Sequence, residues 1–505
     1  MFSTKLMTKA TRNDAPRSTR PDLAAPLNRP LTMRYLITIL ALLSASMGSA
    51  ISGDKLPHIL IILVDDMGYG DVGAYNPDSK IPTPHLDKLS QEGMRFTDAH
   101  APGPLCHLSR YGLLTGQYPF RANTSAWRRQ PSIKSGQLTI ATLLKNKGYN
   151  TAMVGKWHLG FREEGYEKPL AGGPVDVGFN SFFGIRASTD IPPYYYIRGS
   201  KAVQPPTNTI GANSSEGWSR IQGAFWRAGG IAPDLKLAEV LPRFTSEAIS
   251  VIKNHKPSDP DPLFLYLAYP APHTPWLPSR KFKGRGGAGM YGEFCSMVDA
   301  EVGKVLQALE TQKLASDTMV IFTSDNGPVW YDVDIKRFGH DSAGGLRGMK
   351  ADAWEAGHRM PFLLRWPKVV KPGSISSRLI CFTDLMATFA DLTSTTLPAG
   401  KSLDSQSFLP ALTHPSAPHL PREPIVMKAG SGAMMIREGK WKLIDQLGSG
   451  GFSSPKRVRP EKGGPKGQLY DLSSDPSEKT NLWSEYPELV QRLSKRLEQI
   501  AGEDL

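Results

Sequence analysis

The sequence predicts an α/β fold in which a large, mostly parallel sheet is flanked by helices and followed by a small α+β subdomain. Apolar runs rich in β-branched residues alternate with amphipathic stretches along most of the 505 residues. Glycine and proline number 48 and 42, which is high for a helical bundle and typical of many ordered loops. Near residue 400 this alternation gives way to short apolar segments separated by turn residues.

The expected elements follow from apolar periodicity, taken in chain order. Residues 58–64 form an unbroken apolar run, which indicates a strand buried on both faces. The same criteria predict strands at 151–154, 263–268, 319–323 and 361–366, and helices at 84–93, 138–147, 241–255 and 293–311. In the C-terminal part they predict antiparallel strands at 433–436, 441–444 and 469–472, a long loop at 448–467 and a final helix at 487–501.

The first 50 residues have the order of an N-terminal extension followed by an export signal. Arg34 precedes the apolar run 35–43, and small residues fill 44–50. The apolar run is shorter than the roughly 20 residues that cross a bilayer, although a membrane-anchored helix is the alternative. We therefore expect a signal peptide near residues 33–50, a mature periplasmic or secreted chain without a membrane span, one main domain at 51–400 and a subdomain at 401–505.

Charge and cysteine content narrow the possible partners. The net charge of +13 is a weak indication of polyanionic partners. Aromatic residues are not interleaved with basic runs, so nucleic acid is not an expected partner. The chain has three cysteines, too few for a disulfide scaffold. Cys295 and Cys381 stand in helical or apolar contexts, and we expect both in the core.

Polar side chains follow four of the expected strands at the point where each strand ends. They are Asp65 and Asp66, Lys156 and His158, His273, and Asp325 and Asn326. Because ligands of open α/β sheets bind at the carboxyl ends of the strands, these groups predict one composite site. Two adjacent carboxylates repel each other unless a cation lies between them, although a solvated turn or a helix cap is the ordinary alternative. The four oxygen-bearing side chains suit calcium or magnesium.

Cys106 precedes an expected helix at residues 109–115. The N-terminus of a helix presents free N–H groups and positive charge to an oxyanion. Arg110 adds a planar donor fork that fits sulfate or phosphate. A lone cysteine is ordinarily a small buried hydrophobe, so the neighbouring polar clusters decide between the two interpretations.

Seven segments, in the same order along the chain, resemble the signatures of the sulfatase family. Residues 106–116 resemble its Cys-x-Pro-Ser-Arg-x-x-Leu-x-Thr-Gly signature, and Gly-Lys-Trp-His-Leu-Gly at 155–160 resembles its second signature. The other segments are 64–71, 272–275, 324–327, 346–359 and 469–482. The resemblance runs from about residue 57 to about residue 490, and the joint occurrence of the segments is far more specific than any one of them.

The resemblance implies an alkaline-phosphatase-like fold, with a catalytic domain at 51–400, that hydrolyses sulfate monoesters. It implies that a formylglycine-generating enzyme converts Cys106 to formylglycine and that one calcium ion binds. The implied metal ligands are Asp65, Asp66, Asp325, Asn326 and the oxygen derived from Cys106. The implied catalytic residues are Cys106, Arg110, His158 and His273, and the implied substrate-binding residues are Lys156, Lys350 and His273. Basic charge and export favour a sulfated carbohydrate as substrate.

The formylglycine hydrate has two hydroxyl groups with separate tasks. One attacks the sulfur atom, and the other later expels sulfate and restores the aldehyde. By resemblance His158 takes the proton of the hydrate and His273 protonates the leaving alcohol, although the reverse assignment stays open. We expect the substrate pocket to be built by loops at 162–233 and after residue 448. Tyr194–Tyr196 and Trp218 either stack on sugars or pack in the core.

Leu108 departs from the family pattern, which has proline two residues after the cysteine. The modifying enzyme reads the cysteine, that proline and the arginine in the unfolded chain, so we expect slower or partial conversion of Cys106. Two alternatives follow. One is a phosphate or phosphonate ester hydrolase of the same superfamily. The other is a non-catalytic binder of sulfated glycans, which an unconverted Cys106 would produce.

Overall fold

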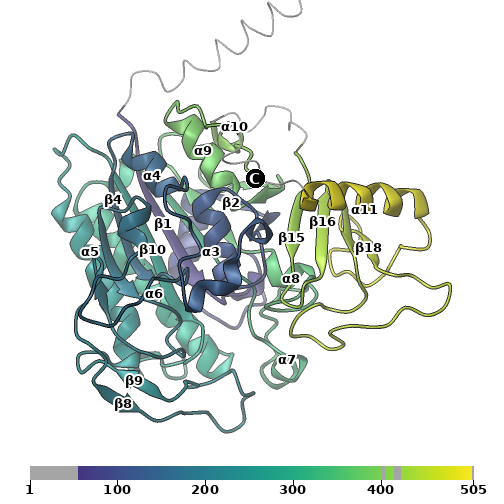
Figure 1. Cartoon of the computed structure of the whole chain (residues 1–505), viewed down its shortest axis with the longest axis horizontal. Helices are drawn as coiled ribbons and strands as arrows, with labels where there is room; N and C mark the ends of the chain where they lie inside the picture. The colour runs from purple at the N-terminus through teal and green to yellow at the C-terminus, as the bar shows by residue number, and fades with distance from the viewer. Residues whose placement is uncertain (1–54, 400–403, 414–421, 503–505) are drawn as a thin grey trace, which may run out of the picture. The chain divides into compact units, whose positions relative to one another are not determined.

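A ten-stranded sheet forms the centre of the part of the chain that the computed structural model describes, residues 55–399, 404–413 and 422–502. Its strand order is β13-β2-β12-β11-β1-β10-β4-β5-β6-β7, and Figure 1 shows β1, β10 and β4 lying side by side. The signal peptide expected at 33–50 lies outside the described residues. Within the described ranges, no helix combines the length and apolarity that a bilayer crossing requires.

The middle of this sheet is parallel. The parallel strands are β11 (Thr318–Ser324), β1 (His58–Asp65), β10 (Leu263–Pro272), β4 (Asn150–Lys156) and β5 (Ser181–Ile185). At one end of the sheet, β12 (Phe362–Arg365) pairs antiparallel with β11 and with β2 (Met94–Phe96), and β13 (Ser374–Ser376) pairs parallel with β2. At the other end, β6 (Ile197–Arg198) and β7 (Lys201–Ala202) add antiparallel pairs. Every residue of β1 is buried, as its unbroken apolar run predicts.

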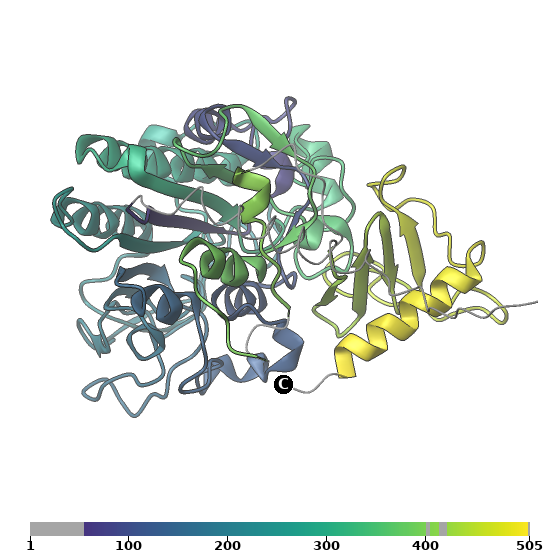
Figure 2. The ribbon, with the colours of Figure 1, turned by 90° about the horizontal axis from the view of Figure 1, so that it is seen from above.

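Two groups of helices cover the sheet, and Figure 2 shows helices on both sides of it. One group contains α2 (Pro84–Glu92), α5 (Val240–Asn254) and α6 (Gly289–Thr311), and the other contains α3 (Cys106–Thr115), α4 (Ile140–Lys145) and α9 (Asp384–Leu392). The predicted mixed α/β architecture is confirmed. Some bounds differ from the prediction: α3 begins at Cys106 and not at Ser109, α6 begins at Gly289 and not at Glu293, and β10 extends to Pro272.

Shorter elements connect these layers. They are β3 (Ala99–His100) with β14 (Ile380–Cys381), the hairpin β8 (Asn208–Ile210) and β9 (Gly229–Ile231), and the helices α7 (Asp332–Phe338), α8 (Glu355–His358) and α10 (Leu409–Thr413). Neither strand of this hairpin contains a buried residue, so β8 and β9 lack the apolar pattern that marks a core strand.

The C-terminal part has its own antiparallel sheet of β15 (Ile425–Lys428), β16 (Met434–Glu438), β17 (Trp441–Ile444) and β18 (Gln468–Asp471). Helix α11 (Pro487–Gly502) contacts β15, β16 and β17. Its buried residues, Val490, Leu493, Leu497 and Ile500, recur every three or four positions, which is the spacing of one helix face. The predicted sheet and final helix are confirmed, and β15 is an additional strand. The domain boundary at residues 400 and 401 stays a prediction.

The strand order positions the predicted site. β11, β1, β10 and β4 are neighbours and run parallel, so their carboxyl ends share one edge of the sheet. These are the four strands after which the sequence places polar clusters. The composite site therefore follows from the topology.

Candidate active site

Cys106 and the two adjacent carboxylates meet at this edge. Asp65 is the last residue of β1, and Asp66 follows it with a φ of 67°, a left-handed conformation that few residues other than glycine adopt. The Cys106 thiol donates to Asp65 Oδ1 at 3.2 Å. This hydrogen bond joins the N-terminus of α3 to the end of the central strand.

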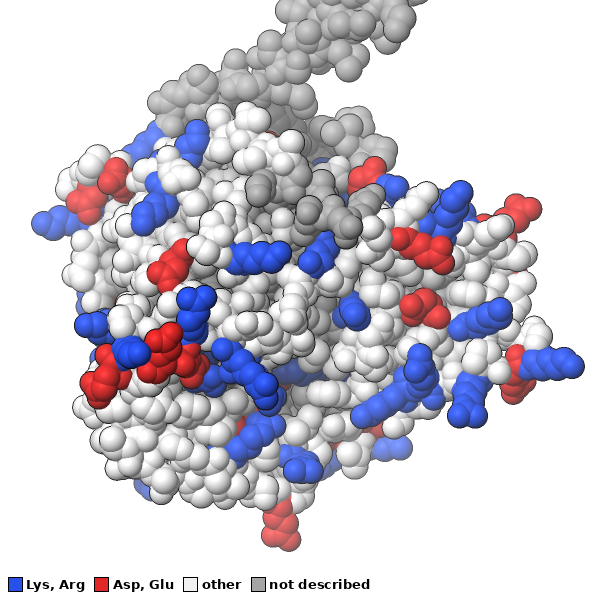
Figure 3. All heavy atoms as spheres, in the orientation of Figure 1, with Lys and Arg blue, Asp and Glu red and all other residues white. Residues whose placement is uncertain are grey.

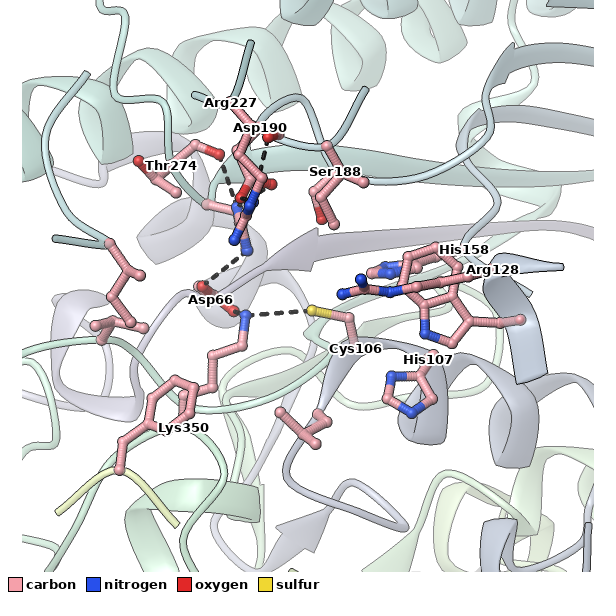
Figure 4. A pocket seen from close by; sticks show the side chains of 17 residues that line it. Asp66, Cys106, His107, Arg128, His158, Ser188, Asp190, Arg227, Thr274 and Lys350 are labelled. Carbon is pink, nitrogen blue, oxygen red and sulfur yellow. Dashed lines mark hydrogen bonds and ion pairs between the residues drawn. The ribbon is translucent and has the colours of Figure 1, made fainter. Parts of the chain in front are cut away.

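Three cations surround the carboxylates. Lys156 Nζ pairs with Asp65 Oδ2. Lys350 Nζ lies 2.5 Å from Asp66 Oδ1 and 3.3 Å from Cys106 Sγ, and Figure 4 shows its amine pointing between these two groups. Arg110 donates to Asp325 Oδ2 from Nε at 3.0 Å and from Nη2 at 2.8 Å. The site therefore holds buried positive charge beside the cysteine.

The charged side chains of the site shift one another's pKa values. Burial favours a neutral Asp65, but Lys156, His273, Arg110 and Lys350 act more strongly together and hold its pKa well below the usual range. Burial and the charge of Asp65 raise the pKa of Asp325 to about 6. Although burial disfavours its charge, Lys350 keeps a raised pKa because Asp66 and the other anions stabilise the ammonium.

Three of the five predicted metal ligands, Asp65, Asp66 and Cys106, lie in one cluster with His273. Ligand atoms of Asp65, Asp66, Cys106 and His273 all lie within 4.8 Å of one another. Asn326 Nδ2 donates to Asp66 Oδ1 at 2.6 Å, while Asn326 Oδ1 is buried and has no hydrogen-bond partner among the described residues. A buried oxygen without a partner is costly unless something positive binds it. The donor set fits a hard divalent cation, and Asn326 Oδ1 is a free oxygen ligand for it.

A second cluster with metal-binding residue types has a different character. His100, Glu355 and His358 lie within 4.8 Å of one another. Lys442 Nζ from β17 lies among them, 2.9 Å from Glu355 Oε1 and 3.1 Å from His358 Nε2. Together these side chains form a buried network of ion pairs and hydrogen bonds that joins α8 to the C-terminal sheet.

The thiol of Cys106 is held in its neutral form. Cys106 is buried at the first position of α3, and the N–H groups of Leu108 and Ser109 both donate to Leu105 O at 3.0 Å. Burial, Asp325 and Asp65 raise the pKa of Cys106 well above its usual value. Since the thiolate is the reactive form of cysteine, the unmodified side chain is a poor nucleophile at this position.

The two predicted catalytic histidines differ in their partners. Both ring nitrogens of His158 are buried and have no hydrogen-bond partner among the described residues. Burial, with Lys156 as the next cause, lowers the pKa of His158 well below its usual value, so its imidazole is neutral. In contrast, His273 Nδ1 lies 2.7 Å from Thr274 O, and His273 Nε2 lies 3.7 Å from Asp66 Oδ2. The Thr274 contact orients Nε2 toward the carboxylates.

A pocket of about 240 Å³ opens above these residues (Figure 4). Of the predicted site residues, Asp66, Cys106, His158, His273 and Lys350 line it. The others, Asp65, Arg110, Lys156, Asp325 and Asn326, are fully buried and are not among the lining residues. Both loops that the sequence singles out contribute to the wall, the first with Ser188, Asp190, Ile191, Ile221 and Arg227 and the second with Phe452.

Several pocket residues carry no signal in the sequence. Asp190 is 4% exposed, pairs with Arg227 through one oxygen, and its Oδ1 has no hydrogen-bond partner among the described residues. His107 and Arg128 also line the pocket. His107 directly follows Cys106 in the sequence, whereas only the tertiary structure brings Arg128 to the same pocket.

Some open assignments are settled by burial. Tyr194, Tyr195 and Tyr196 are at most 4% exposed and belong to the core. Trp218 packs against Trp276 and Phe338, with ring centroids 4.9 and 5.6 Å apart. None of these rings lines the pocket. Cys295 and Cys381 are buried, as expected.

Comparisons with known proteins agree with this geometry. The model of the sulfatase family matches residues 57–395. An N-acetylgalactosamine-6-O-sulfatase from Bacteroides thetaiotaomicron is 33% identical, covering 88% of this chain and 93% of that protein. Arylsulfatase A from Homo sapiens is 32% identical, covering 90% of this chain and 89% of that protein.

A solved structure from Bacteroides thetaiotaomicron, whose description names the metabolism of multiple glycosaminoglycans, has a TM-score of 0.78 and 32% sequence identity. The alignment covers 89% of this chain and 100% of the solved chain. The likeness therefore extends over both sheets, and it confirms the alkaline-phosphatase-like fold that the sequence resemblance implies. The chain belongs to the sulfatase family and is a sulfuric ester hydrolase.

Proposed function

We propose that this sulfatase removes sulfate from sulfated carbohydrates and that the side chain at position 106 acts as formylglycine. The observation that supports this most is the placement of Cys106, whose sulfur lies 3.2 Å from Asp65 Oδ1 and 3.3 Å from Lys350 Nζ on the wall of a pocket. The raised pKa of the thiol argues against cysteine chemistry. A formylglycine hydrate would supply an oxygen nucleophile at the same place.

The surrounding side chains fit the handling of a sulfate ester. His158 is neutral and has two unpartnered nitrogens, which suits a base that takes the proton of the nucleophile. His273 presents Nε2 toward the carboxylates, which suits protonation of the leaving alcohol. Lys350 lines the pocket and places positive charge where sulfate oxygens would lie, while the buried Lys156 and Arg110 add positive charge beneath the pocket floor.

The test is inorganic sulfate release by protein from a host that holds the modifying enzyme. The substrates are an aryl sulfate, 6-sulfated N-acetylgalactosamine, an aryl phosphate and an aryl phosphonate. We expect turnover of both sulfates and little turnover of the phosphate and phosphonate esters. Preferential hydrolysis of the phosphorus esters would favour the alternative hydrolase, and binding of sulfated sugar without any turnover would favour the non-catalytic binder.

Asp65, Asp66, Asp325, Asn326 and the oxygen at position 106 would hold one calcium ion. A bound calcium ion would polarise a sulfate oxygen and stabilise the charge that develops on the nucleophile. The three carboxylates and the unpartnered Asn326 Oδ1 are the features that favour an oxygen-preferring cation.

Loss of a metal ligand is expected to abolish stoichiometric calcium. Elemental analysis should find about one calcium per wild-type chain and almost none in Asp325→Ala, because removing a carboxylate takes away both a ligand and a negative charge. Asp332→Ala changes an exposed carboxylate of α7 and should retain the metal. A wild-type protein without any divalent metal, or an Asp325→Ala protein with a full complement, would contradict the ligand set.

Asp190 and Arg227 are proposed to recognise the sugar. We expect Asp190→Asn to raise KM for a sulfated sugar by about tenfold and KM for an aryl sulfate by less than about twofold, because only the sugar carries hydroxyl groups that can donate to the carboxylate. Asp190 Oδ1 also lies 3.9 Å from His273 Nδ1, so the comparison is of KM and not of kcat. The exposed Asp234→Asn is the matched control. Equal losses on both substrates would show that Asp190 only supports the fold of the pocket.

Leu108 is expected to limit conversion of Cys106. A hydrazide probe that reacts with aldehydes should label only part of the wild-type protein and a larger fraction of Leu108→Pro, because the substitution restores the residue that the modifying enzyme reads. Proline at this first-turn position costs one backbone hydrogen bond, Leu108 N to Leu105 O at 3.0 Å, so the variant should fold. Equal labelling of the two proteins would show that Leu108 does not limit the conversion of Cys106.

The proposal also includes export of the protein from the cytoplasm. The charged, apolar and small-residue order of residues 33–50 supports a signal peptide, and a periplasmic or secreted enzyme would meet extracellular sulfated glycans.

A further inference from the structure

A basic segment of the C-terminal part has no role in the chemistry described above. Residues 455–466, here named the basic loop, lie between β17 and β18 and hold one acidic residue, Glu461. Their five basic residues are all exposed: Lys456, Arg457, Arg459, Lys462 and Lys466. Within the described residues, none of these five side chains forms a salt bridge, although Arg457 acts electrostatically on Asp445.

Several other cations of the C-terminal part are paired with acidic partners. Lys440 pairs with Asp471 at 2.6 Å, and Arg496 pairs with Glu423 at 2.5 Å. The basic loop differs because it directs several uncompensated charges into solvent. Such a concentration of one sign of charge attracts an extended partner of the opposite sign.

Backbone hydrogen bonds hold the start of the basic loop in place. Ser449 N donates to Pro455 O at 3.0 Å, Gly450 N to Lys456 O at 2.9 Å, and Val458 N to Leu447 O at 3.1 Å. Lys456 and Arg457 are therefore carried on a fixed turn. A fixed array of charges binds a polymer with a smaller loss of entropy than a free tail does.

The same turn reaches the active-site pocket. Phe452 lines the pocket, and Ser453 N donates to Asp352 Oδ1 at 3.1 Å, two residues after Lys350. Lys456 is the fourth residue after Phe452, and this length of chain spans at most about 14 Å. An oligosaccharide anchored in the pocket can therefore reach the first charges of the basic loop.

A second cavity continues the active-site pocket toward the same part of the chain. Its volume is about 400 Å³, and Leu105 and His107 line both cavities. The exposed Lys428 lines this second cavity. Ser431 also lines it, and its N–H donates to Gly450 O at 2.8 Å. Figure 3 shows basic side chains across the middle of one face and over the C-terminal part, with fewer acidic ones among them.

We propose that the basic loop binds the anionic chain of a sulfated polysaccharide next to the sugar whose sulfate is removed. This inference rests on the proposed function and adds a polymer-binding surface to it. A small ester would gain nothing from charges outside the pocket, whereas a polymer carries sulfate groups that can contact several of them at once. Each exposed ion pair contributes little, and salt screens it, so the surface should act collectively and weaken with ionic strength.

The experiment compares two variants of equal net charge. The loop variant replaces Lys456, Arg457, Arg459 and Lys462 with glutamine. The control variant replaces Lys145, Lys147, Lys253 and Lys256, which are exposed near the starts of β4 and β10, at the opposite edge of the sheet. Fluorescence anisotropy measures the Kd of each for labelled chondroitin 6-sulfate polymer, in full-length protein that also carries Cys106→Ala so that the polymer is not consumed.

We expect the loop variant to bind the polymer about tenfold more weakly at low salt, and the control variant to stay within about twofold of the parent protein. With Cys106 intact, both variants should hydrolyse an aryl sulfate at the parent rate. Equal polymer affinity in the loop variant and the parent would overturn the inference. Loop-dependent binding to phosphatidylserine vesicles without binding to the polymer would overturn it too. A parent protein that releases no sulfate would reject the proposed function, while the binding comparison would still test the loop.

Discussion

Cys106→Ala is expected to lower kcat for an aryl sulfate by at least about 10⁴-fold, because the variant has no group from which the oxygen nucleophile can form. Lys350 can still bind the sulfate group, with the buried charges of Lys156 and Arg110 behind it, but no group remains that can attack the sulfur atom. Steady-state release of the phenol measures the effect. Loss of one buried sulfur atom should cost only about 1–2 kcal/mol of stability, so the variant should stay folded.

Cys295→Ala is the matched control for this variant. Cys295 is a fully buried residue of α6 whose thiol contacts Tyr291 and does not line the pocket, so its removal leaves a similar small cavity. We expect its kcat to match the wild type. Turnover by Cys106→Ala at the wild-type rate would place the nucleophile elsewhere.

Lys350→Ala is expected to lower kcat by about 10²–10³-fold, the loss typical of removing one group that stabilises charge in the transition state. The Lys350 ammonium lies 2.5 Å from Asp66 Oδ1 and 3.3 Å from Cys106 Sγ. It can therefore offset the negative charge of the Asp66 carboxylate and of a bound sulfate group. Its removal also leaves Asp66 with less positive charge nearby, which destabilises a buried carboxylate. The measurement is kcat on protein that circular dichroism shows to be folded.

Two further variants separate catalysis from folding. Lys350→Met keeps most of the side-chain volume and should show the same loss of kcat with a smaller loss of stability. Lys336→Ala removes an exposed lysine of α7 and should leave kcat unchanged. Wild-type kcat in folded Lys350→Met would remove the ammonium group from the reaction.

The sequence predicted the floor of the site because the floor depends on topology. Asp65, His158, His273 and Asp325 each follow a strand or lie at its end, and parallel neighbours bring such positions to one edge. The unbroken apolar runs identified those strands without any contact information. The errors in element bounds are local; for example, α3 begins at Cys106 because Leu105 O accepts the first helical hydrogen bonds.

The sequence predicts which parts of the chain form the pocket walls, but not which of their residues line the pocket. Loops 162–233 and 448–467 were expected to contribute, but nothing in their periodicity singles out Asp190 or Phe452. Side chains of loops are oriented by tertiary contacts, such as the pairing of Asp190 with Arg227. The aromatic run at Tyr194–Tyr196 shows the same limit, because burial in the core and stacking on a sugar leave the same pattern in a sequence.

Mass spectrometry of the tryptic peptide Phe96–Arg110 tests the central claim most directly. Protein from a host with the modifying enzyme should contain a population in which the mass at Cys106 is that of formylglycine, and sulfatase activity should rise with that fraction. A free thiol in every molecule of an active preparation would contradict the account.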